Sequence, residues 1–67
     1  MFHIRLKEIR KERGLTQKEL SKRINVAERL YQSYEYGKVI PSIIILKKLC
    51  KVLSVSADYL LGLTNKK

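Results

Sequence analysis

The sequence of 67 residues predicts an all-α fold built from five short helices. No stretch alternates apolar and polar residues with a period of two, so strands are not indicated. Apolar residues recur instead at spacings of three and four, which is the pattern of helices that pack by one face. Segments of helical length are separated by Gly14, Gly37, Pro41 and Gly62. We therefore expect a compact single domain over residues 1–67, with short connections between its helices.

The five helices are expected over residues 2–13, 17–23, 28–36, 42–53 and 56–62. In the first helix, Phe2, Leu6 and Ile9 share one apolar stripe, and Gly14 follows its last residue. We expect the tail over residues 63–67 to be frayed, as chain ends commonly are.

The second and third helices have the spacing of a helix-turn-helix. Thr16 precedes the second helix and Glu19 stands three residues later, a pattern typical of a capping box. Ser21 is small enough to let two helices approach, and Asn25 tolerates the left-handed backbone that a sharp turn needs. In DNA-binding versions of this motif the first helix crosses the DNA backbone, while the second enters the major groove.

Inward-facing side chains are expected in the third helix at Leu30, Tyr31 and Tyr34. In the fourth helix they are expected at Ile43, Leu46, Leu49 or Cys50, and Leu53. Ser42 and Ser56 precede the last two helices, where a hydroxyl can accept a bond from an unpaired backbone N–H. On a helical wheel Ile44 aligns with the lysines of the fourth helix, so we expect it to face outward.

Composition and charge narrow the choice of partner. Fifteen Lys and Arg against six Asp and Glu give a net charge of +9, and hydrophobic residues make up 45% of the chain. A folded domain with this charge favours a polyanion, or less often an anionic membrane surface. The membrane alternative is not indicated, because the lysines lie on a folded domain without an exposed apolar stripe. The single cysteine and the lack of a signal peptide or bilayer-length apolar run lead us to expect a cytoplasmic protein.

Catalytic and metal-binding chemistry is not indicated. His3 is the single histidine and has no second metal ligand spaced around it. Cys50 falls on the apolar face of the fourth helix, without a neighbouring base to lower its pKa. The acidic residues are scattered among bases, and there is no glycine-rich phosphate loop. We therefore expect no enzyme, no cofactor and no metal site.

Four segments carry a resemblance to a known family: LKEIRKERGLTQKEL at residues 6–20, YEYGK at 34–38, PS at 41–42 and VSADYLLG at 55–62. With them, the chain from residue 4 to 62 resembles the lambda-repressor-like helix-turn-helix family of Cro/C1 and XRE-type regulators. The resemblance implies a five-helix DNA-binding domain with its helix-turn-helix at the second and third helices. It further implies a sequence-specific transcriptional regulator of prokaryotic or phage type. Such a protein is more often a repressor than an activator, and it binds a palindromic double-stranded operator as a homodimer.

The resemblance also implies roles for individual side chains. The base-reading positions are Glu28, Arg29, Gln32 and Ser33, and the phosphate-contacting positions are Gln17, Lys18, Tyr36 and Lys38. Gln17 is also expected to brace the first recognition residue. Arg29 is well placed for a bidentate contact with guanine. Glu28 has two interpretations: it accepts a bond from a cytosine amino group, or it pairs with Arg29 or Lys18.

Arg10 and Glu35 match the family's buried ion pair between the first and third helices. Both residues border apolar faces, where an unpaired ion would be costly. Four positions depart from the family pattern. Ala27 stands where a Ser or Thr N-cap is usual, and Glu28 is unusual at the entrance to a groove. Leu30 and Tyr31 stand where a small polar residue followed by Ile or Val is usual, and Tyr31 is large for this inner site. We expect the third helix to rotate slightly, with the Tyr31 hydroxyl directed to the surface.

Dimer contacts are expected at Ile44, Ala57 and Tyr59, because relatives often dimerise through the region of the fourth and fifth helices and Tyr59 is expected to be partly exposed. The sequence leaves one other function open. In this alternative the chain is an antitoxin, or another protein-interaction module of a toxin–antitoxin or mobile-element system. Such a module also binds DNA, and it uses its exposed apolar groups to hold an unknown protein partner.

Overall fold

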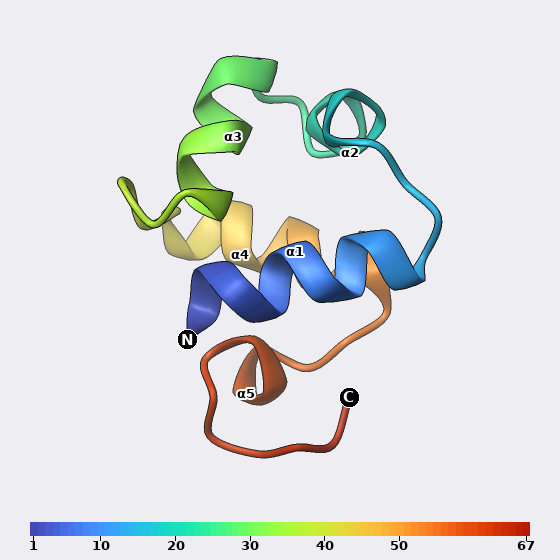
Figure 1. Ribbon diagram of the computed structural model, residues 1–67, viewed down its shortest axis with the longest axis vertical. Coiled ribbons are helices and arrows are strands. Elements are labelled where there is room, and N and C mark those ends of the chain that lie inside the picture. Colours follow the sequence, from blue (N-terminus) through green and yellow to red (C-terminus); the bar gives the residue numbers. More distant parts are fainter.

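The computed structural model describes residues 1–67 and contains five α-helices and no strand (Figure 1). The helices are α1 (Phe2–Glu12), α2 (Gln17–Arg23), α3 (Glu28–Glu35), α4 (Ile43–Leu53) and α5 (Ala57–Leu60). Their ends lie within about two residues of the expected ends. The prediction of an all-α, five-helix fold is therefore confirmed. No helix combines the length and the apolar character that crossing a membrane requires.

The helix-turn-helix lies at one end of the molecule (Figure 1). α2 and α3 lie next to each other at this end, and α5 lies with the C-terminal segment at the opposite end. α1 runs between the two ends and contacts both α3 and α5, while α4 contacts α5. This arrangement leaves the outer faces of α2 and α3 free of the rest of the chain.

Side chains cap the three helices that follow Thr16, Ser42 and Ser56, as the sequence predicts. Thr16 and Glu19 form the expected capping box, in which the Thr16 hydroxyl accepts from the Glu19 N–H at 3.0 Å and the Glu19 carboxylate accepts from the Thr16 N–H at 2.9 Å. Ser42 and Ser56 accept from the N–H groups three residues later at 3.2 and 3.0 Å. Ala27 at the start of α3 provides no such bond, as its methyl side chain predicts. The first turn of α3 therefore lacks a side-chain cap.

The sharp turn between α2 and α3 depends on Asn25. Its φ angle is 59°, in the left-handed region that the sequence predicts for this residue. An asparagine tolerates this conformation better than most residues because its short side chain can bond locally. The turn lets α3 leave at a steep angle to α2 after only the four residues 24–27.

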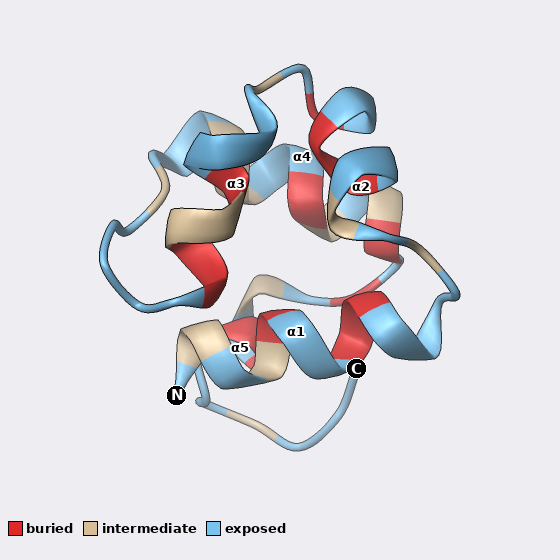
Figure 2. Cartoon of the chain, turned by 45° about the horizontal axis from the view of Figure 1, so that its top comes forward, coloured by how far each residue is buried: buried red, intermediate tan, exposed pale blue.

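A single core holds the five helices together. Its buried side chains are Leu6, Ile9, Leu20, Ile24, Tyr31, Tyr34, Leu49, Leu53, Val55, Tyr59 and Leu60. Figure 2 shows the buried segments of the helices turned toward one another. The expectation that Leu30 and Ile43 face inward is wrong, since they are 42% and 83% exposed. Two tyrosines already fill the inner side of α3, and Ile43 begins α4 at the edge of the core.

Arg5 contacts the C-terminal segment, the part of the chain that we expect to be frayed. One Nη of Arg5 donates to the carbonyl oxygen of Tyr59 at 2.7 Å and to that of Thr64. The other Nη donates to Asn65 Oδ1 at 2.8 Å. The guanidinium group also lies 4.5 Å from the centre of the Tyr59 ring, within the range of a cation–π contact. The sequence has no local signal for these contacts, which span more than fifty positions.

Candidate nucleic-acid interface

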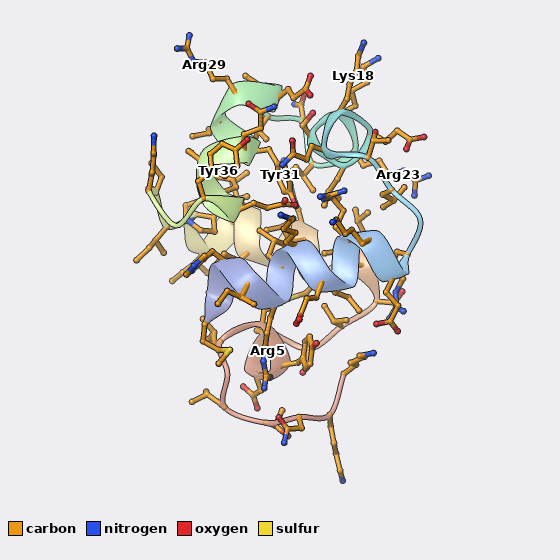
Figure 3. All side chains as sticks on the ribbon, in the orientation of Figure 1. Arg5, Lys18, Arg23, Arg29, Tyr31 and Tyr36 are labelled. Atoms are coloured by element: carbon orange, nitrogen blue, oxygen red, sulfur yellow. The ribbon has the colours of Figure 1, made fainter.

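The outer faces of α2 and α3 gather most of the side chains expected to touch DNA. In Figure 3, Arg29 and Lys18 point away from the body at the end formed by these two helices, whereas Tyr31 points inward. The exposed candidates are Lys18, Glu28, Arg29, Tyr36 and Lys38, and the partly buried ones are Gln17, Gln32 and Ser33. All eight lie on α2, α3 or the segment that follows α3. The structure thus brings the candidate base-reading and phosphate-contacting residues to one end of the molecule.

A buried ion pair lies directly beneath this face. Arg10 Nε donates to Glu35 Oε2 at 2.6 Å, and Arg10 Nη2 donates to Glu35 Oε1 at 3.1 Å. The two side chains are only 9% and 1% exposed. Arg10 also donates through Nη1 to the carbonyl oxygen of Leu15 at 2.8 Å. This two-bond pair fixes α1 to the last residue of α3.

Tyr31 differs from the expectation for its hydroxyl. The side chain is fully buried, and the hydroxyl donates to Glu35 Oε2 instead of reaching the surface. The two residues are four apart on one face of α3, so the phenol reaches the carboxylate without any rotation of the helix being needed. The Tyr31 ring packs edge-on against Tyr34, with ring centres 6.1 Å apart. The large side chain is accommodated because its hydroxyl gives the buried carboxylate of Glu35 a hydrogen bond that water would otherwise supply.

Two glutamine side chains extend this network to the surface. Gln17 Nε2 donates to Glu35 Oε1 at 3.1 Å. Gln32 Nε2 in turn donates to Gln17 Oε1 at 3.3 Å. Gln17 therefore braces a residue in the second turn of α3, rather than a residue at the start of that helix. No sequence pattern pointed to the contact between the two amides, which requires the packing of α2 against α3.

The network also sets the charge state of its members. Burial raises the pKa of Glu35, but hydrogen bonds from Arg10, Tyr31 and Gln17 outweigh burial and leave this pKa below its ordinary value. The hydrogen bond to Glu35 raises the pKa of Arg10 despite burial. Burial, followed by the bond to Glu35, raises the pKa of the Tyr31 hydroxyl. At neutral pH the pair is therefore ionised, and Tyr31 remains a donor.

The remaining candidates on α3 form no ion pair and no hydrogen bond with another side chain. Glu28 forms no ion pair, so neither the expected pairing with Arg29 nor that with Lys18 is present. The Ser33 hydroxyl donates to the carbonyl oxygen of Leu30, which leaves its lone pairs as acceptors.

The three residues expected at a dimer contact have different environments. Ile44 is 70% exposed and Ala57 is partly buried. Tyr59 is buried at 9% exposure, so the expectation that it is partly exposed is wrong. Its ring packs in the core and lies beneath the Arg5 guanidinium, which covers the side that would otherwise face solvent.

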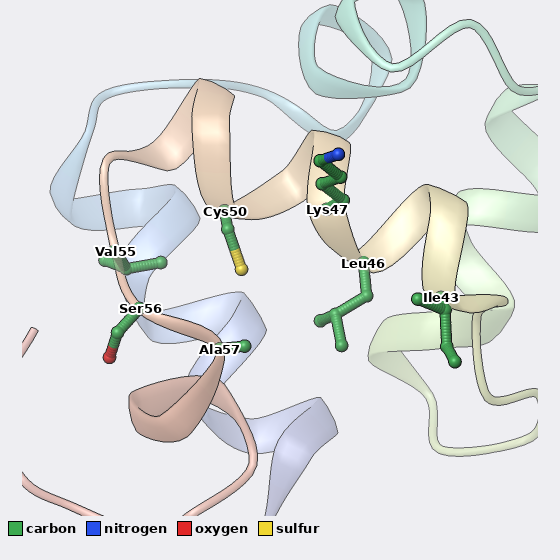
Figure 4. Close-up of a pocket in the computed structure, with 7 residues that line it drawn as sticks. All are labelled: Ile43, Leu46, Lys47, Cys50, Val55, Ser56 and Ala57. Atoms are coloured by element: carbon green, nitrogen blue, oxygen red, sulfur yellow. The ribbon is translucent and has the colours of Figure 1, made fainter.

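The one pocket of the structure lies away from this interface, between α4 and the segment leading into α5 (Figure 4). It is lined by Ile43, Leu46, Lys47, Cys50, Val55, Ser56 and Ala57. Burial raises the pKa of the Cys50 thiol, so this sulfur is not an activated nucleophile. No cluster of three His, Cys, Asp or Glu side chains is present that would hold a metal ion.

Comparison with known proteins identifies relatives of this architecture. The chain matches a family model described as helix-turn-helix over residues 6–60. It is 38% identical over 61 residues to the SPbeta prophage-derived HTH-type transcriptional regulator YonR of Bacillus subtilis, covering 91% of this chain and 56% of that protein. It is 41% identical over 58 residues to the HTH-type transcriptional regulator ImmR of Bacillus subtilis, covering 87% of this chain and 46% of that protein. The chain therefore spans about half the length of these relatives.

Solved structures share both the fold and the sequence pattern. SinR, described as the master regulator for biofilm formation, matches in its complex with DNA with a TM-score of 0.83 and 39% identity, over 91% of this chain and 98% of that chain. The SinR and SinI protein complex matches with a TM-score of 0.84 and 39% identity, over 91% of this chain and 60% of that chain. The chain thus belongs to the helix-turn-helix family of the Cro/C1, or XRE, type, whose members are DNA-binding transcriptional regulators rather than enzymes.

Proposed function

We propose that this chain is a sequence-specific regulator, acting as a repressor, that reads the major groove of double-stranded DNA with α3. One observation carries the proposal. Lys18 and Arg29 on the outer faces of α2 and α3 point into solvent, and beside them the amides of Gln17 and Gln32 are held by a buried network. The regulators to which the chain is similar, and the relative solved with DNA, support the part of the proposal that concerns DNA binding and regulation.

Base reading is assigned to the outward side chains of α3. Arg29 lies in the first turn and carries two parallel donors, which suit the O6 and N7 acceptors of guanine. Glu28 has no ion-pair partner and can accept a bond from the amino group of cytosine. Gln32 and Ser33, one turn further along, are the other two base-reading candidates.

Phosphate contacts are assigned to residues that border α3 on both sides. Lys18 and Gln17 lie in the first turn of α2, while Tyr36 and Lys38 follow α3. Phosphates carry the sequence-independent part of the affinity, since each neutralised phosphate releases a condensed counterion. The net charge of +9 supports strong and salt-dependent binding. Choice of sequence then depends on the few base-facing side chains.

A dimer on DNA is part of the proposal. A single recognition helix reads only a few base pairs, and two half-sites about 34 Å apart on one face of a palindromic operator supply the missing specificity. Ile44 is exposed and remains a candidate contact between copies, together with Ala57. Tyr59 is no longer a candidate, because it is buried within its own domain. A repressor of this kind acts by occupying the operator, and we expect it in the cytoplasm.

Selection of bound duplexes from a random library tests the proposal. The selection is run at two salt concentrations, because the phosphate contacts weaken as salt rises while the ranking of sequences persists. A regulator that binds as a dimer yields a palindromic consensus at both concentrations. Recovery of no consensus contradicts sequence-specific binding, and a consensus with a single half-site contradicts the dimer.

A protein-interaction module, such as an antitoxin, is the alternative function. It is favoured by the exposed side chains of Ile40, Ile43 and Ile44, which lie close together in sequence at the start of α4. Because such a module also binds DNA, the discriminating result is isolation of the chain in a stoichiometric complex with a second protein.

A further inference from the structure

We propose that Gln32 selects adenine at one operator position, and that Tyr31 is a positioning residue for this choice. The effect of Tyr31 passes through the buried carboxylate of Glu35 and the amide of Gln17. The inference rests on the proposed function, because it concerns the bases that the same interface reads. It assigns a role to a tyrosine that is fully buried.

The first step is the chemistry of Glu35. Its ionised carboxylate accepts hydrogen bonds and has none to donate. Two bonds come from Arg10, one from the Tyr31 hydroxyl and one from Gln17 Nε2. Because only the nitrogen of an amide donates, the nitrogen of Gln17 faces Glu35. The carbonyl oxygen of Gln17 is thereby turned toward α3.

The second step carries this orientation to Gln32. A carbonyl oxygen needs a donor, so the Gln32 side chain turns its nitrogen toward Gln17, and the two atoms lie 3.3 Å apart. The directions of both amides follow from the charge on Glu35. If that carboxylate were absent or turned away, either amide would be able to adopt the opposite orientation.

The third step is what Gln32 has left to offer. One N–H is used on Gln17, so the second N–H and the carbonyl oxygen remain available. Adenine presents one acceptor and one donor in the major groove, at N7 and N6, and this pair matches the free groups of a glutamine. Guanine presents two acceptors, N7 and O6, and its O6 would oppose the carbonyl oxygen. A fixed amide therefore favours adenine over guanine, whereas a freely turning amide discriminates less.

The role of Tyr31 follows from the sharing of the two carboxylate oxygens. The Tyr31 hydroxyl and Arg10 Nε bind Oε2, and this leaves Oε1 for Arg10 Nη2 and Gln17. Loss of the hydroxyl leaves Oε2 with one donor, so the carboxylate can tilt and loosen its hold on Gln17. Tyr34 provides a matched control, because it is buried in the same helix but forms no bond with Glu35.

The test is selection from a random duplex library with the wild-type chain and the variants Tyr31→Phe, Gln32→Ala and Tyr34→Phe. Thermal unfolding of each variant sets a temperature at which all are folded. A bidentate base contact discriminates about 5- to 150-fold against the wrong base. We expect Gln32→Ala to abolish the adenine preference at one position of each half-site. Tyr31→Phe is expected to lower the adenine-to-guanine ratio there about threefold to tenfold, and Tyr34→Phe to leave it unchanged.

Four results overturn the inference. If Gln32→Ala keeps every base preference, Gln32 is not the residue that reads adenine. Tyr31→Phe that weakens binding to all duplexes equally, or changes only thermal stability, shows a purely structural tyrosine. An equal loss of adenine preference in Tyr34→Phe assigns the effect to core packing. If the wild-type chain itself selects no consensus, the proposed function fails first and the inference falls with it.

Discussion

Replacement of Arg10 by methionine is the most direct test of the buried network that supports α3. The variant Arg10→Met keeps an unbranched apolar stem but removes all three hydrogen bonds of the guanidinium group, two of them to Glu35. The carboxylate of Glu35 then stays buried, with Tyr31 and Gln17 as its remaining donors. The expected result is a folded but strongly destabilised domain.

The size of the effect follows from the burial and the bonds of the pair. Breaking a buried ion pair by removing one partner costs about 3–5 kcal/mol. Two neutral donors still serve Glu35, so we expect a value near the lower end, about 3 kcal/mol. For a domain of this size, each kcal/mol lowers the melting temperature by about 4–8 °C. A loss of this size is a large part of the stability of a small domain.

Urea and thermal unfolding followed by circular dichroism measure this loss, and pH identifies its cause. The pKa of Glu35 in the fold lies below its ordinary value of 4.5, so its contribution to wild-type stability is present above that pH and is lost as pH falls through the folded pKa. Protonated Glu35 no longer needs a cation, so the gap between wild type and Arg10→Met should narrow in acid. The double variant Arg10→Met with Glu35→Gln should be more stable than Arg10→Met at neutral pH, since it buries no unpaired charge.

Two outcomes would refute this reasoning. A loss below about 1 kcal/mol would place the ion pair among exposed pairs, which contribute little. A double variant less stable than Arg10→Met at neutral pH would show that the unpaired charge on Glu35 is not the source of the loss.

Four further predictions concern the surface of the domain. Arg29→Ala should weaken binding to the selected operator by about 1–3 kcal/mol and relax the preference at one base pair; an equal loss on random DNA would make Arg29 a phosphate contact. Lys38→Ala should weaken binding to every duplex and reduce the slope of log affinity against log salt by about one, measured by fluorescence anisotropy titration. Ala27→Ser should raise the free energy of unfolding by about 0.5–1 kcal/mol by capping α3, and no change in urea unfolding would contradict this. Ile44→Asp should reduce two-copy occupancy of the operator in sedimentation analysis, and undiminished pairing would remove Ile44 from the dimer contact.

Local signals in the sequence were sufficient for the helix ends and the turn. The capping box of Thr16 and Glu19 and the left-handed turn at Asn25 involve only residues within three or four positions of one another. Their geometry depends on the backbone next to them, so a sequence pattern predicts them well. The clustering of DNA-facing candidates followed from the family resemblance, which supplied their order along α2 and α3.

Contacts between distant residues were beyond such patterns. The large size of Tyr31 predicts that its hydroxyl reaches the surface. The actual direction of the hydroxyl depends on Glu35 and on the helices around it. Tyr59 was expected to be partly exposed because α5 is short, yet Arg5 from the other end of the chain covers its ring. Gln32 meets Gln17 only after α2 and α3 have packed. Each of these contacts depends on tertiary structure that helical periodicity does not encode.

The buried network divides the surface of α3 into two parts that differ in how freely their side chains can be replaced. Arg29 and Glu28, in the first turn, form no side-chain ion pair with each other or with Lys18, so they can be exchanged one at a time to retarget the domain. Gln32, in the second turn, is joined to Gln17 and the core, and a new side chain there requires compatible changes beneath it. Libraries that vary the first turn alone should therefore yield many functional binders, whereas libraries at Gln32 should succeed mainly when Gln17 varies with it.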